Sequence, residues 1–576
     1  MKNIIQYLLD ETHCHSARWR FPYEKTTISG KHLAKSVKEY AVVLQSRGIG
    51  KGDRIGFTLE NGFDFVCLLY ATWYLNAVAV PLRPRTGRYY DYVKYIRDCD
   101  NVCGFKLIIC ENEESTNELS KWAVENEKTK LPLSEITREV LDGDHDMNPA
   151  SVEISAQDIA VIQFSSGSTG NPKGVIVTHA MMMAQLKNIE DNHSKSRSGS
   201  KVESSASWLP VNHDMGLFIG VLSPIYSACD NVLAPPAYYM KNPRRWFGLL
   251  SEYGVDFTFS TNSVLASSLN SLRGLRTQSD IELSKLHIYI AAEKVSPIIV
   301  RKTWDCLSQF GCPQSHIHVG YGMAENALGA TYTSGGIQLT WFVLDSDDNL
   351  SLCEPDDPYG FELTSIGIAN DEHTITIRNE TNEILSDLQL GEICIESPCV
   401  SPAYYNDPLT TELKLKDGVL RTADLGFHYN GEFYFYSRAD DLIIVGGRNI
   451  VPDDIETTVE SLDFIRYGGS VLLGIEDQIT GAMQLHLLLE SNGKLPANRI
   501  ADRCVEVRKY ILDKHDLLIK TISVCSKGSI EKTSSGKKRR KVIKQRLSNS
   551  EITVLEKEYP NEFQGENQDY EYQEAI

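Results

Sequence analysis

Helix-like and strand-like stretches alternate along the first half of this sequence, and this alternation constrains the fold more than any other feature. Residues 31–48 repeat apolar side chains with the period of an amphipathic helix, whereas residues 53–59, 105–112, 159–166 and 287–293 are short apolar stretches typical of buried strands. Strands separated by helices favour parallel sheets with helices packed on their faces. The predicted fold class is therefore α/β with largely parallel sheets.

At 576 residues the chain is too long for one hydrophobic core, so at least two domains are expected. Residues 191–207 are polar and serine-rich, which predicts a loop inside the first domain. The sequence changes character between Gly431 and Pro452, and the segment that follows has the size of a small domain. We therefore predict a large domain over residues 1–437 and a small domain over residues 438–576.

Composition argues against several kinds of partner and setting. The formal net charge of −19 disfavours binding to nucleic acid or to anionic membranes, because both need an electropositive protein surface. The thirteen cysteines are scattered and include no C-x-x-C pair, so neither a disulfide framework nor a cysteine-rich zinc site is indicated. Asp10 and Glu11 interrupt the apolar N-terminal stretch, which argues against an export signal. These features predict a cytoplasmic protein.

One uncharged stretch, residues 65–82, just reaches the length at which a membrane span is considered. A second interpretation needs no lipid, because Asn76 can adopt the left-handed conformation that ends a helix and Pro81 can end a strand. Helix, cap and buried strand then account for the whole stretch. We prefer this interpretation and predict no membrane span.

A polar loop with the sequence QFSSGSTGNPKGVIVTH, residues 163–179, contains the end of the strand predicted at 159–166. Its glycines allow close approach of backbone N–H groups, its hydroxyls donate hydrogen bonds and its lysine adds a positive charge, so the loop is suited to holding phosphates. The candidate phosphate ligands are Ser165, Ser166, Gly167, Ser168, Thr169, Gly170 and Lys173. The spacing differs from G-x-x-x-x-G-K-[ST], which disfavours a Walker-type NTPase. Taken alone, such a loop is more often a simple turn.

The full string resembles the phosphate loop of adenylate-forming enzymes, the superfamily of acyl-CoA synthetases, luciferases, peptide-synthetase adenylation domains and fatty acyl-AMP ligases; Ser165 replaces the usual threonine. Further stretches resemble the superfamily's motifs in the same order along nearly the whole chain, and so many ordered matches are improbable by chance. They are SWLPVNHDMGLFIGVLSPIYS (207–227), AAEKV (291–295), GYGMAEN (320–326), GEICIES (391–397), RTADLG (421–426), SRADDLIIVGGRNIVPDDIE (437–456) and KTSSGKKRR (532–540).

This resemblance implies a large N-terminal adenylation domain and a small α+β C-terminal domain on a hinge. It also implies the reaction, in which the carboxylate of an acid attacks the α-phosphorus of ATP, with Mg²⁺ and positive charge screening the two anions. Glu325 matches the magnesium ligand of the superfamily. Tyr321 and Glu293 match residues beside the adenine, and Asp424 and Arg438 match residues that bind the ribose hydroxyls. Taken singly, the last two are more typical of a turn aspartate and a surface arginine.

Lys537 matches the lysine that, in the superfamily, reaches from the C-terminal domain to bridge the carboxylate and the α-phosphate. A flexible point charge suits that task. We expect Lys537 and His213 to be the catalytic residues. Taken alone, the basic run 537–541 is more typical of a solvated or nucleic-acid-binding patch. Asp440 matches the hinge about which the small domain rotates between adenylation and acyl transfer.

Three features resemble fatty acyl-AMP ligases in particular: the string LPVNHDMGL, the string GRNIVPDDIE, and residues 337–361 at the place where those ligases carry an insertion. The resemblance implies that His213, Asp214 and Gly216 line the acyl site. Asp214 also resembles the amino-group anchor of amino-acid-activating domains, but the acyl-AMP ligases carry it too. The resemblance to fatty acyl-AMP ligases further implies that the acyl group passes to the phosphopantetheine arm of an acyl carrier protein.

Other interpretations remain open at this point. An acyl-CoA or aryl-CoA synthetase has the same core motifs. Residues 261–269 and Lys294 depart from the acyl-AMP ligase pattern, which leaves the identity of the acid undetermined. A non-catalytic binding module would have lost Lys537, Glu325 or Asp424, and none is lost. A serine acyl-hydrolase would need a G-x-S-x-G elbow or a K-T-G partner for its S-x-x-K, and neither occurs.

Overall fold

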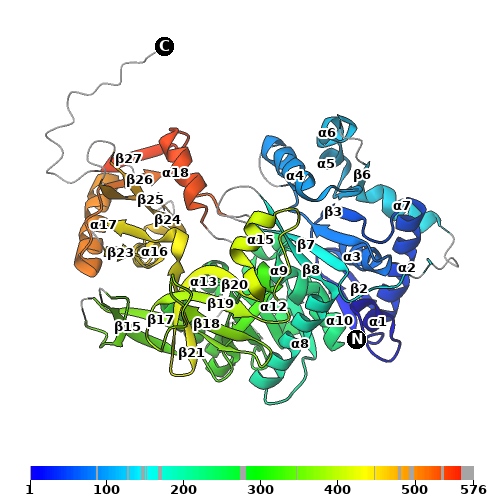
Figure 1. Cartoon of the computed structure of the whole chain (residues 1–576), viewed down its shortest axis with the longest axis horizontal. Coiled ribbons are helices and arrows are strands. Elements are labelled where there is room, and N and C mark those ends of the chain that lie inside the picture. Colours follow the sequence, from blue (N-terminus) through cyan, green and yellow to red (C-terminus); the bar gives the residue numbers. More distant parts are fainter. Residues whose placement is uncertain are drawn as a thin grey trace, which may run out of the picture. The chain divides into compact units, whose positions relative to one another are not determined.

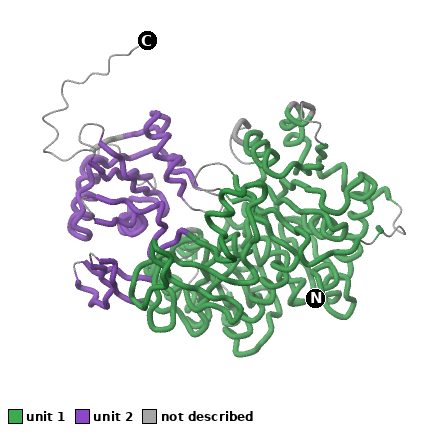
Figure 2. Tube along the Cα trace, viewed as in Figure 1, with its two compact units in different colours: residues 1–339, 364–422, 426–435 green, residues 340–363, 423–425, 436–576 purple. Residues whose placement is uncertain are grey.

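The computed structural model describes residues 2–85, 89–125, 129–143, 149–150, 152–165, 172–272, 281–345, 347–357, 359–445, 448–477, 482–491, 499–532 and 538–558. The chain divides into two compact units (Figures 1 and 2). Unit 1 comprises residues 1–339, 364–422 and 426–435, and unit 2 comprises residues 340–363, 423–425 and 436–576.

The first sheet of unit 1 is parallel except at one edge. Its strands lie in the order β6 (Thr129–Pro132), β5 (Leu107–Cys110), β3 (Arg54–Thr58), β4 (Val78–Pro81), β7 (Ile159–Ser165) and β8 (Lys173–Thr178), and only β8 is antiparallel to its neighbour. Helix α3 (Phe63–Tyr74) joins β3 to β4, and the Trp73 indole on this helix donates a hydrogen bond of 2.8 Å to the Ala160 carbonyl of β7. Helix α2 (Gly30–Ser46) packs against α3.

The second sheet of unit 1 has a parallel centre. Strands β1 (Arg18–Phe21), β10 (Asp230–Leu233), β9 (Ser204–Ser207), β11 (Phe257–Thr261), β12 (His287–Ala291) and β13 (Ile317–Gly322) are parallel neighbours in this order. Antiparallel strands extend both ends: β2 (Thr26–Ser29) beside β1, and β14 (Gly329–Tyr332), β17 (Phe361–Ala369), β21 (Glu432–Arg438), β20 (Leu420–Tyr429), β19 (Gly391–Glu396) and β18 (Thr374–Arg378) beyond β13. The predicted parallel-rich α/β class is confirmed.

Helices connect the strands of unit 1, as expected for parallel neighbours. They are α1 (Ile4–Leu9), α4 (Tyr89–Cys103), α5 (Glu113–Glu118), α6 (Ser120–Glu125), α7 (Leu133–Asp142), α8 (His179–Ser196), α9 (Asp214–Leu217), α10 (Ser223–Ser227), α11 (Pro236–Lys241), α12 (Pro243–Glu252), α13 (Asn262–Leu272), α14 (Pro297–Leu307) and α15 (Pro408–Lys414). In Figure 1, α2, α3 and α7 lie in the blue and cyan part of unit 1.

Unit 2 is built around a small mixed sheet in the order β24 (Ile465–Glu476), β25 (Met483–Ser491), β26 (Thr521–Cys525) and β27 (Val554–Glu558). Only the β25–β26 pair is parallel. Helices α16 (Pro452–Val459) and α17 (Ile500–His515) share a buried apolar cluster with this sheet, and Ile543 of α18 (Arg540–Ser548) lies in a second cluster. The unit also contains the hairpins β22–β23 (Ile443–Val445, Arg448–Ile450) and β15–β16 (Leu339–Leu344, Leu350–Leu352). Strands and helices are therefore mixed, in agreement with the α+β expectation.

The apolar stretch at 65–82 forms the predicted helix, cap and strand. Helix α3 ends at Tyr74, Asn76 has φ of +52°, and β4 ends at Pro81. None of the helices in the described part of the chain combines the length and the apolar character that crossing a bilayer requires.

The loop predicted at residues 191–207 is wrong at both of its ends. Helix α8 continues to Ser196, and residues 204–207 form β9, which is buried within the second sheet. Strand β9 consists only of serine and alanine, so it lacks an apolar signal. Its small side chains suit this position because Gly220 packs closely here, where an added Cβ would lie 3.0 Å from the Ser207 side chain. Tertiary packing thus overrides local composition.

All thirteen cysteines lie in the described part of the chain, and none forms a disulfide. Eleven are buried, whereas Cys306 at the end of α14 and Cys353 after β16 are half-buried. Burial raises the pKa of several of the buried thiols, including that of Cys229 to about 12. Buried thiols of this kind behave as small apolar side chains.

Candidate active site

Neighbouring parallel strands of the second sheet lead into four of the predicted residues of unit 1. The strands β9, β11, β12 and β13 run in the same direction, so their carboxyl ends meet at one edge of that sheet. His213 follows β9, Glu293 follows β12, and Glu325 follows β13, while Tyr321 is the second-to-last residue of β13. The carboxyl edge of a parallel sheet is the usual location for ligands in α/β proteins.

The turn that carries Glu325 is fixed by close backbone packing. An added Cβ at Gly322 would lie 1.8 Å from the Leu328 carbonyl oxygen, so only glycine fits there. The Met323 N–H donates to the same carbonyl at 2.8 Å. The buried Asn326 side chain donates to the Gly329 carbonyl at 2.9 Å and accepts from the Ser397 hydroxyl at 2.6 Å. The backbone of this turn therefore holds Glu325 in one place.

Tyr404 links the two charged residues expected to meet the phosphates. Its hydroxyl donates to a Glu325 carboxylate oxygen at 2.7 Å, and Lys173 Nζ lies 5.9 Å from the centre of its ring. Lys173 also donates to the Thr410 hydroxyl at 2.9 Å. Burial, and then the Glu325 charge, raise the pKa of Tyr404, so the hydroxyl stays protonated and acts as a donor. The sequence analysis missed Tyr404.

Backbone pairing explains why Tyr404 lies there. Residues 403–405 run beside β8, with hydrogen bonds from Ile176 N to Ala403 O at 3.3 Å and from Tyr405 N to Gly174 O at 2.7 Å. The Ser401 N–H donates to the Glu325 carbonyl at 2.7 Å. The strand that follows the phosphate loop and the turn that carries Glu325 are thus joined through one segment.

The loop before α9 carries the predicted acyl-site residues and is held by two buried amides. The Asn61 amide donates to the Leu209 carbonyl at 2.8 Å and accepts from the Val211 N–H at 3.1 Å. The Gln163 amide of β7 donates to the Asn212 carbonyl. Both amides were missed by the sequence analysis, because they act across more than forty residues of chain.

Gly216 and its neighbours adopt a tight helix start. An added Cβ at Gly216 would lie 2.0 Å from the Pro210 carbonyl oxygen, so the Asp214–Leu217 helix can pack on this loop only with glycine. His213 is the residue before the helix, and its N–H donates to the Pro210 carbonyl at 3.0 Å. Asp214 accepts from the Met215 N–H at 2.7 Å. This packing fixes the backbone at His213 and Asp214.

Only the ends of the predicted phosphate loop can be placed. Ser165 closes β7 and is paired in register with Lys173, the first residue of β8. The expected ligands Ser166, Gly167, Ser168, Thr169 and Gly170 lie outside the described residues. The loop therefore joins two antiparallel strands, and Lys173 lies at its base, beside Tyr404.

Residues 10–405, more than two thirds of the sequence, match the family described as AMP-binding enzyme. The chain belongs to this family. It is an adenylate-forming ligase, and the expectations of this superfamily and of an enzyme are confirmed. The interpretations as a serine hydrolase and as a non-catalytic module are set aside with it.

Curated relatives cover nearly the whole enzyme. The long-chain-fatty-acid–AMP ligase FadD26 of Mycobacterium bovis is 26% identical over 522 residues, which cover 86% of this chain and 87% of the relative. The medium-chain-fatty-acid–[acyl-carrier-protein] ligase JamA of Moorena producens is 27% identical over 574 residues, covering 93% of each chain. A putative fatty-acid–CoA ligase of Mycobacterium tuberculosis, fadD25, is 26% identical and covers 92% of this chain and 93% of the relative.

The fold of the enzyme also agrees with solved structures. A structure from a study of fatty acyl-adenylate ligases from E. coli and L. pneumophila superposes with a TM-score of 0.83 at 24% identity, covering 96% of this chain and 98% of that chain. At this identity the likeness concerns the fold alone.

The predicted ribose-binding pair of the enzyme lies in unit 2. Arg438 Nε donates to an Asp424 carboxylate oxygen at 3.0 Å, and Asp424 is buried whereas the Arg438 side chain is 46% exposed. Ala423, which precedes this aspartate, has φ of +60°, a conformation that favours glycine. An alanine in this conformation stores backbone strain next to Asp424.

Two further predicted residues belong to unit 2. Asp440, the expected hinge, lies in a short helical turn, and its carboxylate is 3.4 Å from the Lys541 ammonium. Lys537, the expected catalytic lysine, lies outside the described residues. The residues on either side of residues 533–537 are paired with each other, because Lys532 and Lys538 form an antiparallel bridge.

The residues around Glu325 are compatible with magnesium shared with a nucleotide. Mg²⁺ prefers oxygen ligands and is commonly held by one or two carboxylates together with substrate phosphates and water. Glu325 supplies one such carboxylate, and its Tyr404 contact occupies a single lone pair of one oxygen. No group of three or more histidine, cysteine or acidic side chains that could hold a metal ion occurs in the part of the chain that the structure describes.

Proposed function

We propose that this enzyme joins a fatty acid to AMP with release of pyrophosphate, and then transfers the acyl group to the phosphopantetheine thiol of an acyl carrier protein. The observation that carries the adenylation step is the contact of Tyr404 both with Lys173, at the base of the phosphate loop, and with Glu325, which follows the parallel strand β13. The names of FadD26 and JamA support the fatty acid and the carrier.

In the proposed adenylation step, a carboxylate oxygen of the acid forms a bond to the α-phosphorus of ATP as the bond to pyrophosphate breaks. Lys173 and the phosphate loop neutralise the phosphate oxygens, and Lys537 bridges the carboxylate and the α-phosphate. Mg²⁺, held through Glu325 when bound, supplies further charge screening. Positive charge is needed because both reactants are anions.

The remaining residues hold the substrates. Tyr321 stacks near the adenine with Glu293 beside it, and Asp424 accepts from the ribose hydroxyls next to Arg438. His213 acts in catalysis beside the carboxylate, and His213, Asp214 and Gly216 form the acyl site at the start of α9. The fixed backbone of that helix start supports a site with one geometry.

The domain organisation is also part of the proposal. Residues 1–437 bind ATP and the acid, and residues 438–576 carry Lys537 and rotate about Asp440 between the two steps. Residues 337–361 contain the β15–β16 hairpin, in which Phe342 pairs with Leu352. These residues thus form a β-hairpin at the place where the acyl-AMP ligases carry their insertion. This favours a carrier protein over CoA as the acceptor of the acyl group.

The experiment measures pyrophosphate release with hydroxylamine as the acceptor, across acids from short to long chain and including hydroxybenzoates and amino acids. The preferred acid is then offered together with CoA or with a phosphopantetheinylated carrier protein. We expect thioester only on the carrier. Efficient acyl-CoA formation would instead assign the enzyme to the CoA ligases, the class that the name of fadD25 suggests.

Two variants test the residue roles. Lys537→Ala should lose adenylation while ATP still binds, whereas Lys544→Ala, an exposed lysine of α18, should behave as the parent enzyme. Glu325→Ala should raise the magnesium concentration needed for half-maximal adenylation. Unchanged adenylation in Lys537→Ala, or an unchanged magnesium requirement in Glu325→Ala, would remove the corresponding assignment.

A further inference from the structure

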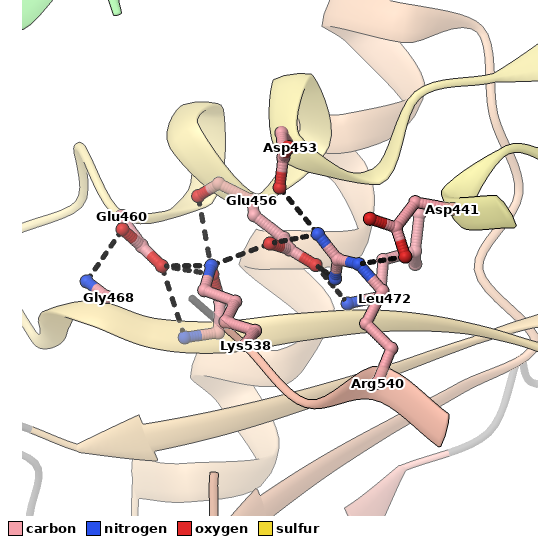
Figure 3. A network of polar contacts seen from close by, with 9 residues as sticks. Asp441, Asp453, Glu456, Glu460, Gly468, Leu472, Lys538 and Arg540 are labelled. Atoms are coloured by element: carbon pink, nitrogen blue, oxygen red, sulfur yellow. Dashed lines mark hydrogen bonds and ion pairs between the residues drawn. The ribbon is translucent and has the colours of Figure 1, made fainter. Parts of the chain in front are cut away.

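A buried network of ion pairs in unit 2 surrounds Glu456 of α16, which is only 1% exposed (Figure 3). Lys538 Nζ donates to one Glu456 oxygen at 2.6 Å, and the Leu472 N–H of β24 donates to the other at 2.6 Å. The Arg540 guanidinium donates to both oxygens. Glu456 therefore ties a helix and a strand to the residues that directly follow position 537.

The network extends along the same helix face. Glu460 accepts from Lys538 at 3.1 Å and from the Gly468 N–H at 2.7 Å, so Lys538 lies between two carboxylates. Burial alone would lower the pKa of Lys538, but the charges of Glu456 and Glu460 outweigh it and raise this pKa above its ordinary value. Lys538 is thus a buried cation that holds residue 538 against α16.

Arg540 also reaches the segment that contains the expected hinge. Its guanidinium donates to Asp453 and lies 3.8 Å from the Asp441 carboxylate, which neighbours Asp440. Burial raises the pKa of Asp441, and the Arg540 charge opposes this shift. In Figure 3 the Arg540 side chain extends from the start of α18 to Asp453, Glu456 and Asp441. One guanidinium therefore contacts both the hinge segment and the helix that anchors the residues after 537.

The base of residues 533–537 is held on its other side as well. The Lys532–Lys538 bridge joins the two ends, and the Arg539 N–H donates to the Glu531 carbonyl at 2.9 Å. A displacement of about 1 Å at a reacting group can reduce a rate about 10²-fold. Loss of an anchor beside a catalytic residue can therefore slow the reaction.

We infer that Arg540 and Glu456 are positioning residues for adenylation, which couple the Asp440–Asp441 segment to the chain immediately after Lys537. This inference rests on the proposed role of Lys537. Arg540 is suited to the task because its planar fork donates in fixed directions to both oxygens of Glu456 and to Asp453. Because the desolvation of buried charges offsets much of their attraction, such ion pairs add little net stability, and their role in fixing one arrangement is what the variants below test.

The experiment compares Arg540→Lys, Arg540→Gln and Glu456→Gln in the full-length chain with the control Arg546→Gln. Arg546 lies on the same helix, is half-buried and pairs with Glu531, outside the network. Adenylation is followed by pyrophosphate release with the preferred acid, and kcat and KM are determined separately. We expect kcat to fall by about 10-fold to 10²-fold in the three network variants with the KM for ATP and acid within about twofold. The control should keep its kcat.

A combination with Lys537→Ala separates positioning from a general structural effect. Because Arg540 is inferred to act through Lys537, the double variant Arg540→Gln with Lys537→Ala should be no slower than Lys537→Ala alone. If the losses of kcat in the two single variants multiply in the double variant, the inference is wrong. It is also wrong if Arg540→Lys and Glu456→Gln both keep the parental kcat. Thermal unfolding is recorded for each variant, and Glu456→Gln, which keeps the side-chain volume, carries the test if Arg540→Gln does not fold.

The outcomes also distinguish this inference from the proposed function. If Lys537→Ala retains full adenylation, the role of Lys537 is wrong and the inference falls with it. If Lys537→Ala is inactive but the network variants have normal kcat, the function stands and only the positioning role is refuted.

Discussion

Tyr404→Phe removes one hydroxyl from the candidate site and leaves the rest of the buried ring in place. The lost group is the donor to Glu325 at 2.7 Å. A hydrogen bond to a charged group contributes about 1.5–3 kcal/mol, and each 1.4 kcal/mol corresponds to a factor of about ten. Because Glu325 is partly exposed, water replaces some of this interaction, so we take the lower end of the range.

The loss should appear as weaker magnesium binding. Groups that orient a metal ligand typically change metal affinity about 10-fold to 100-fold. We therefore expect the magnesium concentration for half-maximal adenylation to rise about tenfold, while kcat at saturating magnesium changes by less than about threefold. The assay is pyrophosphate release at fixed ATP and acid over a magnesium titration.

The neighbouring tyrosine provides a matched control. Tyr405 packs against a buried apolar cluster that includes residues of β4, β5 and α4, so Tyr405→Phe should leave the magnesium titration unchanged. An unchanged titration in Tyr404→Phe, in an enzyme whose titration does respond to Glu325→Ala, would refute the reasoning that Tyr404 orients this carboxylate. Equal shifts in both tyrosine variants would point to a general packing effect.

Three other changes have expected outcomes. Ala423→Gly should raise the free energy of unfolding by about 1 kcal/mol in chemical denaturation. Glycine relieves about 1–2 kcal/mol of backbone strain at φ of +60°, which exceeds the cost of about 0.4–1 kcal/mol from the greater entropy of the unfolded chain. A variant that is less stable than the parent would show that Ala423 is not strained. Asp424→Asn should raise the KM for ATP about tenfold through loss of a charged acceptor, and a parental KM would exclude Asp424 from the ribose site. Burial lowers the pKa of His287 to about 3 and that of His318 to about 4. Between pH 6.5 and about 4 the unfolded chain therefore binds more protons than the folded chain. The free energy of unfolding should fall as pH falls through this window, by about 1.4 kcal/mol per pH unit for each histidine. A midpoint of thermal unfolding that does not change from pH 7 to pH 5 would contradict this.

Local patterns predicted the parts of the fold that local forces determine. The helix that ends at Tyr74, the cap at Asn76 and the strand that ends at Pro81 all follow from apolar period and turn chemistry. Strand β9 does not, since serine and alanine carry no strand signal and its position depends on the strands beside it.

The candidate site divides in the same way. Glu325 and His213 could be singled out from the sequence because each lies within a recognisable motif, GYGMAEN and LPVNHDMGL. Tyr404, Asn61 and Gln163 could not, because each contributes through a contact with a residue far away along the chain. The network around Glu456 likewise joins residues more than eighty positions apart.

The distribution of thiols in the two units makes the natural chain suited to spectroscopic labelling. Thiol-directed dyes and spin labels react through the thiolate and need access to it, which burial and a raised pKa deny to most of the cysteines. Cys306 in unit 1 and Cys353 in unit 2 are only half-buried, although burial also raises the pKa of Cys353. A fluorophore or nitroxide pair at these positions would report the distance between the end of α14 and the segment that follows β16, without an engineered cysteine and without removal of the other eleven.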